Sequence, residues 1–548
     1  GDTGNGILDI FDRYNFTVKE DEPLEKEVAV DPEMLGKVFE NLLEVKDRKS
    51  KGTYYTPREI VHYMCQQSLS NYLAAELAES VTKAEIETLM QYGETVSANE
   101  ARVANTGKET ATYSYKLPES IRQNAQLIDE KLANIKVCDP AIGSGAFPVG
   151  MMSEIVRARN VLSVFIKAPD RTIYQFKRDC IEKSLYGVDI DPSAVEIAKL
   201  RLWLSLVVDE DDMQQIKPLP NLDYKIVCGN SLLGVEKNLF NNQLFADLER
   251  LKPLLFNETS PKKKQAYKQQ IDELISQITN GHKEFDFEVY FSEVFHEQGG
   301  FDVVIGNPPY VQLQTDSGKL ANLYKNCGFQ TFARTGDIYC LFYEKANQLL
   351  KKQGVACYIT SNKWMRAAYG EKLRKYLAHQ TQPLKLIELG PGVFESATVD
   401  TNILLFAKNK TIETFFGCSL KKQTEWSLSA FVHQYGVNIP VRTDGHKWEI
   451  HSPLQQTLTQ KIDTNGTPRA PSVWEIASYE ARMQGFVRQV EQTGMLDTLN
   501  EYTSSVLASN GTHAIYTAVG APMVDMGLVI FTNTIKEIEK SWEGIDQK

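Results

Sequence analysis

Short apolar runs, each ended by Gly, Pro, Asp or Asn, recur through the middle of the chain and predict buried strands. They are too short for buried helices and alternate with stretches of helical periodicity, a pattern typical of an α/β fold. The five runs are Ile135–Cys138, Leu185–Ile190, a run that ends at Cys228, Asp302–Ile305 and Gly354–Thr360. Two further apolar strands are expected within residues 384–408. We therefore expect an open, mostly parallel sheet that binds ligands at the carboxyl ends of its strands.

The fourth run belongs to the sequence FDVVIGNPPY, residues 301–310. Two consecutive prolines have no N–H for a strand ladder, so the turn after this strand is rigid. The turn presents the Asn307 amide, the Pro308 carbonyl and the Tyr310 ring. Two acceptors beside a flat ring suit a planar group that carries an NH2, such as a nucleobase. The alternative is a proline-rich turn that only caps a core strand.

The first two strands end in acidic residues. The first is followed by DPAIGSGAF, residues 139–147, in which the glycines allow the backbone to approach a ligand closely. Asp139 precedes these glycines, which favours a ligand with a positive group, such as an amino acid moiety, over a pyrophosphate. An acid at the end of the second strand typically accepts hydrogen bonds from ribose hydroxyls. We expect Asp189 to have that role and Asp191 to cap the following helix.

Two other polar residues stand next to predicted elements. Asn230 follows the third strand, where its side chain either pairs with an adenine edge or makes a turn. Thr56 precedes Pro57 and a helical stripe, and Glu59 is spaced to complete a capping box with it. The free N–H groups of such a helix start can hold a carboxylate, although a plain helix cap is the simpler interpretation.

The later strands bring basic and aromatic residues. Five basic residues fall within 363–375, interleaved with aromatic residues, and they either contact phosphates or form the solvated face of a helix. Phe394 is expected to be exposed on a loop between the last two strands. It is a candidate second wall for a base pocket, or alternatively a core anchor.

Composition limits the class of protein without fixing it. The 548 residues suggest about two to four domains, and 42% hydrophobic and 24% charged residues are ordinary for a globular protein. The net charge of −11 argues against a protein that coats nucleic acid but allows a local basic cleft. Eight cysteines without a C-x-x-C pair fit reduced thiols in the cytoplasm, and we expect no metal site. The sequence shows no signal peptide and no apolar run of membrane-spanning length.

Seven motifs then stand in one order along the chain. They are YYTPREIV (54–61), DPAIGSG (139–145), YGVDIDP (186–192), CGNSLL (228–233), IGNPPY (305–310), GDIYCLF (336–342) and the late strand pair with Phe394. This ordered set resembles the gamma class of amino-methyltransferases that act on adenine in DNA. It is more closely similar to the methylase region of type IIG restriction–modification enzymes, from about residue 7 to 410.

The resemblance implies an α/β, Rossmann-like, S-adenosylmethionine-dependent methyltransferase sheet with helical insertions. The catalytic domain would span 51–410, with insertions at about 80–130 and 236–285. An N-terminal helical segment, 1–50, would precede it, and 411–548 would form a partial target-recognition domain.

The resemblance also implies roles for single residues. Asn307 and the Pro308 carbonyl would grip the N6 amine of a flipped adenine, with Tyr310 stacked on the base and Phe394 on its other side. S-adenosylmethionine would be held at its methionine end by the 139–147 loop and Thr56, at its ribose by Asp189, and at its adenine by Asn230, where family members often have Asp. The implied cofactor set is Thr56, Asp139, Ala141, Gly143, Gly145, Phe147, Asp189, Ile190, Asn230 and Ser231.

The function implied is site-specific methylation of adenine N6 in double-stranded DNA, within a restriction–modification or defence system of a bacterial or archaeal cytoplasm. A restriction or specificity protein is an expected partner. We find no P-D…(D/E)-x-K nuclease site before residue 51, so we expect this chain to lack the nuclease, naturally or by truncation. Two alternatives stay open. One is a protein glutamine N5-methyltransferase, since NPPY serves that chemistry too, and the other is a catalytically inactive DNA-binding specificity component.

Overall fold

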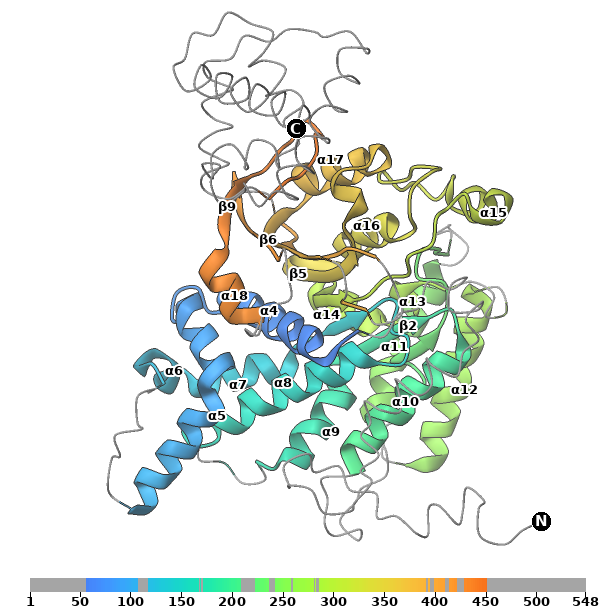
Figure 1. Ribbon diagram of the computed structural model, residues 1–548. Coiled ribbons are helices and arrows are strands. Elements are labelled where there is room, and N and C mark those ends of the chain that lie inside the picture. The colour runs from blue at the N-terminus through green and yellow to red at the C-terminus, as the bar shows by residue number, and fades with distance from the viewer. Residues whose placement is uncertain are drawn as a thin grey trace, which may run out of the picture. The chain divides into compact units, whose positions relative to one another are not determined.

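The computed structural model of the chain contains one nine-stranded sheet within the residues that it describes (Figure 1). Those residues are 56–450 without 107–116, 167, 169–170, 208–221, 236–241, 258–259, 280, 282–284, 391–392, 395–398, 410–412 and 421–427. The strands are β1 Val137–Asp139, β2 Leu185–Asp189, β3 Ile226–Cys228, β4 Phe301–Gly306, β5 Leu350–Ser361, β6 Gln382–Gly390, β7 Thr401–Ala407, β8 Thr414–Ser419 and β9 Val437–Pro440. The five predicted apolar runs correspond to β1–β5, and the predicted α/β sheet is confirmed.

The strand order is β3-β2-β1-β4-β5-β7-β6-β8-β9. Strands β1 to β5 are parallel, whereas β7 runs antiparallel to both β5 and β6. The chain builds outward from β1 to β3 on one side and returns to β4 on the other side of β1. The carboxyl ends of β1 and β4 therefore form the topological switch point, where an open α/β sheet binds its ligands.

Helices cover the sheet, and strands such as β1 and β4 are therefore buried on both faces. The helices are α4 Arg58–Glu76, α5 Lys83–Thr106, α6 Glu119–Gln123, α7 Ala125–Asn134, α8 Ala146–Leu162, α9 Ile173–Lys183, α10 Pro192–Val207, α11 Asn242–Asn257, α12 Pro261–Ile278, α13 Phe287–Tyr290, α14 Ser292–Gln298, α15 Thr315–Tyr324, α16 Tyr339–Leu349, α17 Glu371–Gln380 and α18 Leu428–Tyr435, with the 3-10 turns η2 Asn362–Met365 and η3 Ala368–Gly370. None of the helices described is long and apolar enough to cross a membrane.

Helix α4 has the strongest bearing on the site. It packs against α8 and against β4 and β5, and it contributes buried Met64, Leu69 and Leu73 to the main core. This packing brings the start of α4 to the sheet although it precedes β1 by sixty residues or more in the sequence. The chain just before α4 is thereby carried to the switch point.

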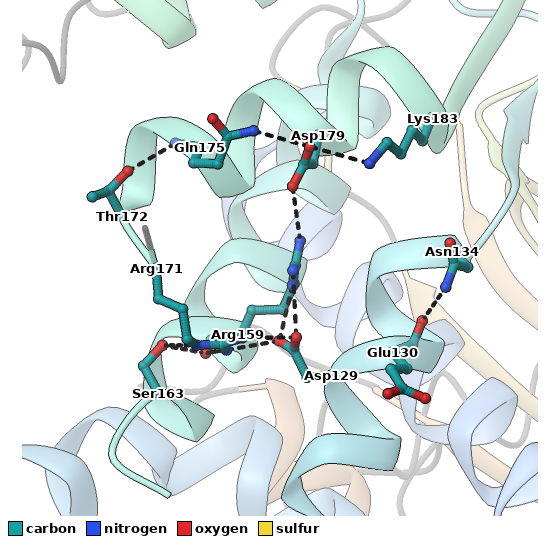
Figure 2. A network of polar contacts seen from close by, with 10 residues as sticks. All are labelled: Asp129, Glu130, Asn134, Arg159, Ser163, Arg171, Thr172, Gln175, Asp179 and Lys183. Atoms are coloured by element: carbon teal, nitrogen blue, oxygen red, sulfur yellow. Dashed lines mark hydrogen bonds and ion pairs between the residues drawn. The ribbon is translucent and has the colours of Figure 1, made fainter. Parts of the chain in front are cut away.

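An ionic network joins α7, α8 and the start of α9 (Figure 2). Asp129 accepts hydrogen bonds from Arg159 Nε and from both terminal nitrogens of Arg171, each at 2.9 Å. The Arg159 guanidinium also lies over the Phe176 ring, 4.4 Å from its centroid. Burial opposes the charge on Asp129, but the hydrogen bonds from Arg171 and Arg159 outweigh it and hold the pKa of Asp129 below its ordinary value. The network fixes these helices on the sheet.

The stretch between β3 and β4 contains two helices, α11 and α12, that pack on each other with their own small apolar core. At the other end of the sheet, β8 pairs in parallel with β6 and antiparallel with β9. The boundary expected at residue 410 thus falls inside the sequence that builds this sheet, and the structural unit extends to Trp448. The expected N-terminal helical segment, 1–50, and most of the region 411–548 lie outside the described residues.

Candidate active site

Asp139 ends β1 at the switch point and is only 1% exposed. Its Oδ1 accepts a hydrogen bond from the Ala141 N–H at 3.0 Å, whereas its Oδ2 has no hydrogen-bond partner among the residues that the structure describes. Burial raises the pKa of Asp139 well above its ordinary value, the Ala141 N–H opposes the rise, and the charge of Asp189 adds to it. Such a carboxylate is stabilised by a cation brought beside it, as expected for an amino acid moiety.

The glycine loop after β1 is fixed from both sides. Gly145 has a φ of +88°, and a Cβ there would lie 3.1 Å from Ala198 Cβ, so only glycine suits this start of α8. Buried Arg201 donates to the Ser144 carbonyl at 2.8 Å. Phe147, in the first turn of α8, is buried in the core. The loop is thereby held in a fixed conformation beside Asp139.

Asp189 ends β2 and supports the same loop. Its Oδ2 accepts from the Gly143 N–H and its Oδ1 from the Asp191 N–H, both at 2.9 Å. Burial raises the pKa of Asp189, while these two N–H groups oppose the rise. Asp191 in turn accepts from the Ser193 N–H at 2.9 Å, so the expected helix cap is confirmed. Ile190, between the two acids, is 67% exposed and offers an apolar surface at this edge.

The loop after β3 contributes Asn230 and Ser231. Asn230 Oδ1 accepts from the Leu232 N–H at 3.0 Å, which is the turn contact named as one alternative. Its Nδ2 also donates to the Tyr324 hydroxyl at 2.9 Å, a partner that the sequence did not indicate. Ser231 is buried and donates to the Pro140 carbonyl at 2.5 Å, which ties this loop to the one after β1.

The turn after β4 lies directly beside Asp139. A Cβ on Gly306 would come within 2.5 Å of Asp139 Oδ1, so a side chain at this position would displace the carboxylate. The next residue, Asn307, donates from Nδ2 to the Thr56 hydroxyl at 3.1 Å. This contact orients the amide so that its oxygen is directed away from Thr56. Pro308 follows and is buried.

The expected capping box at Thr56 is wrong. Helix α4 begins at Arg58, Pro57 occupies the N-cap position, and no side chain caps the helix. Thr56 lies one residue too early, and its buried hydroxyl accepts from Asn307 instead. The residue is therefore part of the constellation at the switch point, although not for the local reason that the sequence suggested.

Tyr310 and Phe394 lie together. Their ring centroids are 6.3 Å apart and the ring planes meet at 73°, an edge-to-face contact. Tyr310 also donates to the Ile359 carbonyl at 3.3 Å and packs edge-to-face on Tyr339. The expected exposure of Phe394 is wrong, since the side chain is 3% exposed and belongs to the main core. A base between these rings would require them to separate.

The basic residues at 363–375 divide into two groups. Arg374 is buried and donates to the carbonyls of Gly445, Trp364 and Ala367, so it is structural. The other four are exposed: Lys363, Arg366, Lys372 and Lys375. Arg366 pairs with Glu388 at 2.7 Å, and Lys375 with Glu371 at 2.6 Å. Lys372 donates from Nζ to the Phe332 carbonyl at 2.8 Å, and Lys363 lies exposed in the turn η2.

The structure therefore gathers the predicted residues at one edge, from segments before β1 and after β1, β2, β3 and β4. Tyr324 was not among the predicted site residues, and Asp337 and Tyr339 had no predicted role, although the GDIYCLF motif contains both. Tyr324 had no signal, because it lies in a polar stretch on α15 and matters only through its contact with Asn230.

Residues 183–394 match the family model described as the Eco57I restriction-modification methylase. This part of the chain is similar to that family, which confirms the resemblance derived from the motif order.

Curated restriction enzymes and methyltransferases are similar to longer parts of the chain. The putative type II restriction enzyme and methyltransferase RM.MjaORFECS2P of Methanocaldococcus jannaschii is 27% identical over 490 residues, 73% of this chain and 40% of the relative. RM.Eco57I of Escherichia coli is 26% identical over 54% of this chain and 27% of its own length. The adenine-specific methyltransferase PglX of Lacticaseibacillus casei is 21% identical over 72% of this chain and 33% of its own length. The chain thus spans less than half the length of these relatives.

Among solved structures, the type IIL restriction-modification enzyme MmeI in complex with DNA aligns with a TM-score of 0.40 and 14% identity. The alignment covers 76% of this chain and 44% of that chain.

Proposed function

We propose that this chain transfers a methyl group from S-adenosylmethionine to N6 of an adenine in DNA, as the modification activity of a restriction–modification or related defence system. The observation that carries the proposal is the convergence of Asp139, Gly306, Asn307 and Thr56 at the switch point. At this point, a carboxylate suited to bind a cationic cofactor lies beside a turn suited to bind an exocyclic amine. The curated relatives, described as restriction enzymes and adenine-specific methyltransferases, support DNA adenine over a protein glutamine as the substrate.

The residues present fit S-adenosylmethionine. The buried Oδ2 of Asp139 would accept from the α-ammonium group of the methionine end, within the cradle of Gly143 and Gly145. Asp189 would accept from the ribose hydroxyls in addition to the N–H groups that it holds now. Ile190 would cover one face of the cofactor's adenine, and Asn230 would face its edge beside Tyr324. The cofactor, when bound, supplies a methyl group on a positively charged sulfur.

The turn after β4 would act on the target base. The N6 amine of adenine is a poor nucleophile because its lone pair is delocalised into the ring. If Asn307 Oδ1 and the Pro308 carbonyl accept its two hydrogens, the nitrogen becomes more pyramidal and gains electron density, which stabilises the transition state electrostatically. Thr56 holds the Asn307 amide in the orientation that this role needs. Placing the nitrogen in line with the methyl group supplies the orientation of the reactants.

This methyl transfer requires no metal ion and no covalent intermediate with the enzyme. The bound cofactor would supply the methyl group, its sulfur would keep the electron pair of the broken sulfur–carbon bond, and one N6 proton would pass to water. The adenine must first leave the duplex, which costs on the order of a few kcal/mol, and stacking on Tyr310 offsets part of that cost. Exposed Lys363 and Arg366 would contact the backbone of the same DNA.

The test uses tritiated S-adenosylmethionine and plasmid DNA from a host without adenine methylation, followed by sequencing that detects methylated bases. Methyl transfer to adenine within one recurring sequence is the expected result. Transfer to a glutamine-containing peptide and not to DNA would favour the glutamine alternative. Binding of DNA without cofactor binding, measured by calorimetry, would favour the inactive specificity component.

A further inference from the structure

A triangle of three oxygen atoms lies behind the ring of Tyr310. Asp337 Oδ2 accepts from the Tyr339 hydroxyl at 2.9 Å and from the Tyr369 hydroxyl at 2.6 Å, and the two hydroxyls are 2.9 Å apart. Asp337 and Tyr339 are buried, and both belong to the GDIYCLF motif. Burial raises the pKa of the Tyr339 hydroxyl well above its ordinary value, so it remains a donor. A buried acid with two phenol donors is a strong, closed hydrogen-bond unit.

The backbone on either side of this acid is bound to the segment that follows the NPPY turn. Ile338 N–H donates to the Val311 carbonyl, and Leu313 N–H donates to the Gly336 carbonyl, both at 2.9 Å. Gln312 and Asp337 form an antiparallel bridge between the two segments. The chain leaving Tyr310 therefore cannot move independently of the chain that carries Asp337.

The side chains complete the connection. The Tyr339 ring lies edge-to-face on Tyr310, with centroids 5.9 Å apart and planes at 80°. Tyr369, the third member of the triangle, lies in η3, close in sequence to the exposed Lys363 and Arg366. One oxygen of Asp337 thus joins the ring behind the base-stacking tyrosine to the segment that carries exposed cations.

We propose that Asp337 is a positioning residue that, through the Tyr339 hydroxyl, holds the Tyr310 ring in place for the target base. This inference rests on the proposed function. In its favour, the hydrogen bond from the Tyr339 hydroxyl to Asp337 fixes the Tyr339 ring, and this ring lies edge-to-face on Tyr310. When the hydroxyl is released, the Tyr339 ring keeps its volume but loses its fixed tilt, and Tyr310 loses one of the contacts that set its own tilt, beside its hydrogen bond to Ile359 and its contact with Phe394. The methyl transfer step then slows, while cofactor binding, which uses the other side of the switch point, stays the same.

The experiment compares Tyr339→Phe, Asp337→Ala and Asp337→Asn with the control Tyr343→Phe. Tyr343 lies one turn further along α16, is equally buried, and bonds through its hydroxyl to Thr360 at 2.8 Å. The measurements are kcat and KM for methyl transfer from tritiated S-adenosylmethionine to unmethylated plasmid DNA, the cofactor Kd by calorimetry, and the melting temperature. A 2-aminopurine duplex at the methylated site then reports capture of the flipped base.

We expect Tyr339→Phe and Asp337→Ala to lower kcat about tenfold, the effect of roughly one lost hydrogen bond on the reacting geometry. The cofactor Kd should stay unchanged, the 2-aminopurine signal should fall, and the melting temperature should match that of Tyr343→Phe. Asp337→Asn should retain more activity than Asp337→Ala, because both hydroxyls donate to the same oxygen of Asp337. Tyr343→Phe should keep the wild-type kcat.

Wild-type kcat in Tyr339→Phe and Asp337→Ala would overturn the inference while the proposed function stands. A parallel loss of melting temperature, cofactor affinity and kcat would also overturn it, since that is the signature of a residue that only stabilises the fold. A wild-type protein that methylates no DNA would overturn the proposed function itself, together with this inference.

Discussion

Asn307 donates a hydrogen bond from Nδ2 to the hydroxyl of Thr56 at 3.1 Å, across 251 positions of sequence. Asn307 directly follows the central strand β4, and Thr56 directly precedes Pro57, the N-cap residue of the first helix that the structure describes. The contact holds the rigid turn after β4 against the chain before α4, beside the buried carboxylate of Asp139. It fixes the orientation of the amide on which the proposed chemistry depends.

Replacing Asn307 separates catalysis from cofactor binding. We expect Asn307→Ala to abolish methyl transfer to DNA, because the N6 amine loses an acceptor that acts in the transition state. The affinity for S-adenosylmethionine should stay within about threefold, a change of less than 1 kcal/mol. Calorimetry and tritium transfer on the same preparations measure both. Asn326→Ala, at an exposed asparagine, is the control and should behave as wild type. Equal loss of binding and transfer would remove the turn from the target-base site.

The raised pKa of Asp139 predicts that cofactor binding depends on pH. Burial raises the pKa of its carboxyl, and only the ionised form attracts the ammonium group of the cofactor. Binding should therefore strengthen as pH rises through this raised pKa, in a range above that of an ordinary aspartate. Calorimetry with S-adenosylmethionine across this range measures the effect. Asp139→Asn should bind more weakly and without this dependence. A variant with the wild-type pH profile would show that another group is responsible.

Tyr310 and Phe394 should both affect capture of the flipped base, with different side effects. Tyr310→Ala removes a half-buried ring, and a fall in 2-aminopurine fluorescence at the target is expected with little change in stability. Phe394→Ala should lower the same signal and also destabilise the fold, by about 3–5 kcal/mol, because its ring is buried in the main core. Phe394→Leu keeps most of that volume and isolates the effect on the base. An unchanged fluorescence signal in Tyr310→Ala and Phe394→Leu would exclude both rings from the pocket.

The Asp129 network predicts how stability depends on pH. The folded-state pKa of Asp129 lies below its unfolded value, so its contribution is full above the unfolded pKa of about 3.9 and is lost as pH falls through the folded pKa. Asp129→Ala leaves buried Arg159 without this partner and should cost about 3–5 kcal/mol near neutral pH. Urea unfolding at neutral and acidic pH measures this cost, which should shrink on acidification. Glu130→Ala, at the exposed neighbour, should cost little. A cost that does not change with pH would contradict the linkage.

The strands were predictable because each is a local apolar run with its own ending. The placement of Asp139, Asp189 and Asn307 at one edge of the sheet was predictable for the same reason, since each stands at the carboxyl end of such a run and parallel strands bring these ends together. The capping of α10 by Asp191 was also local. These features needed no information about distant contacts.

The parts that the sequence did not reveal depend on contacts between distant segments. Thr56 looked like a helix cap because nothing near it in sequence shows that α4 packs on β4 and β5. Phe394 looked exposed because it lies in the segment between two strands, and nothing near it in sequence indicates its contact with Tyr310. The Asp337 triangle required Tyr369, thirty-two residues further on, to be seen as a unit.

The most direct test of the central claim is mass spectrometry of nucleosides from plasmid DNA incubated with the protein and S-adenosylmethionine carrying a deuterated methyl group. We expect labelled N6-methyladenine with the wild-type chain and none with Asn307→Ala, while both proteins bind the cofactor. Label in N4-methylcytosine, or equal amounts of labelled N6-methyladenine from both proteins, would contradict it.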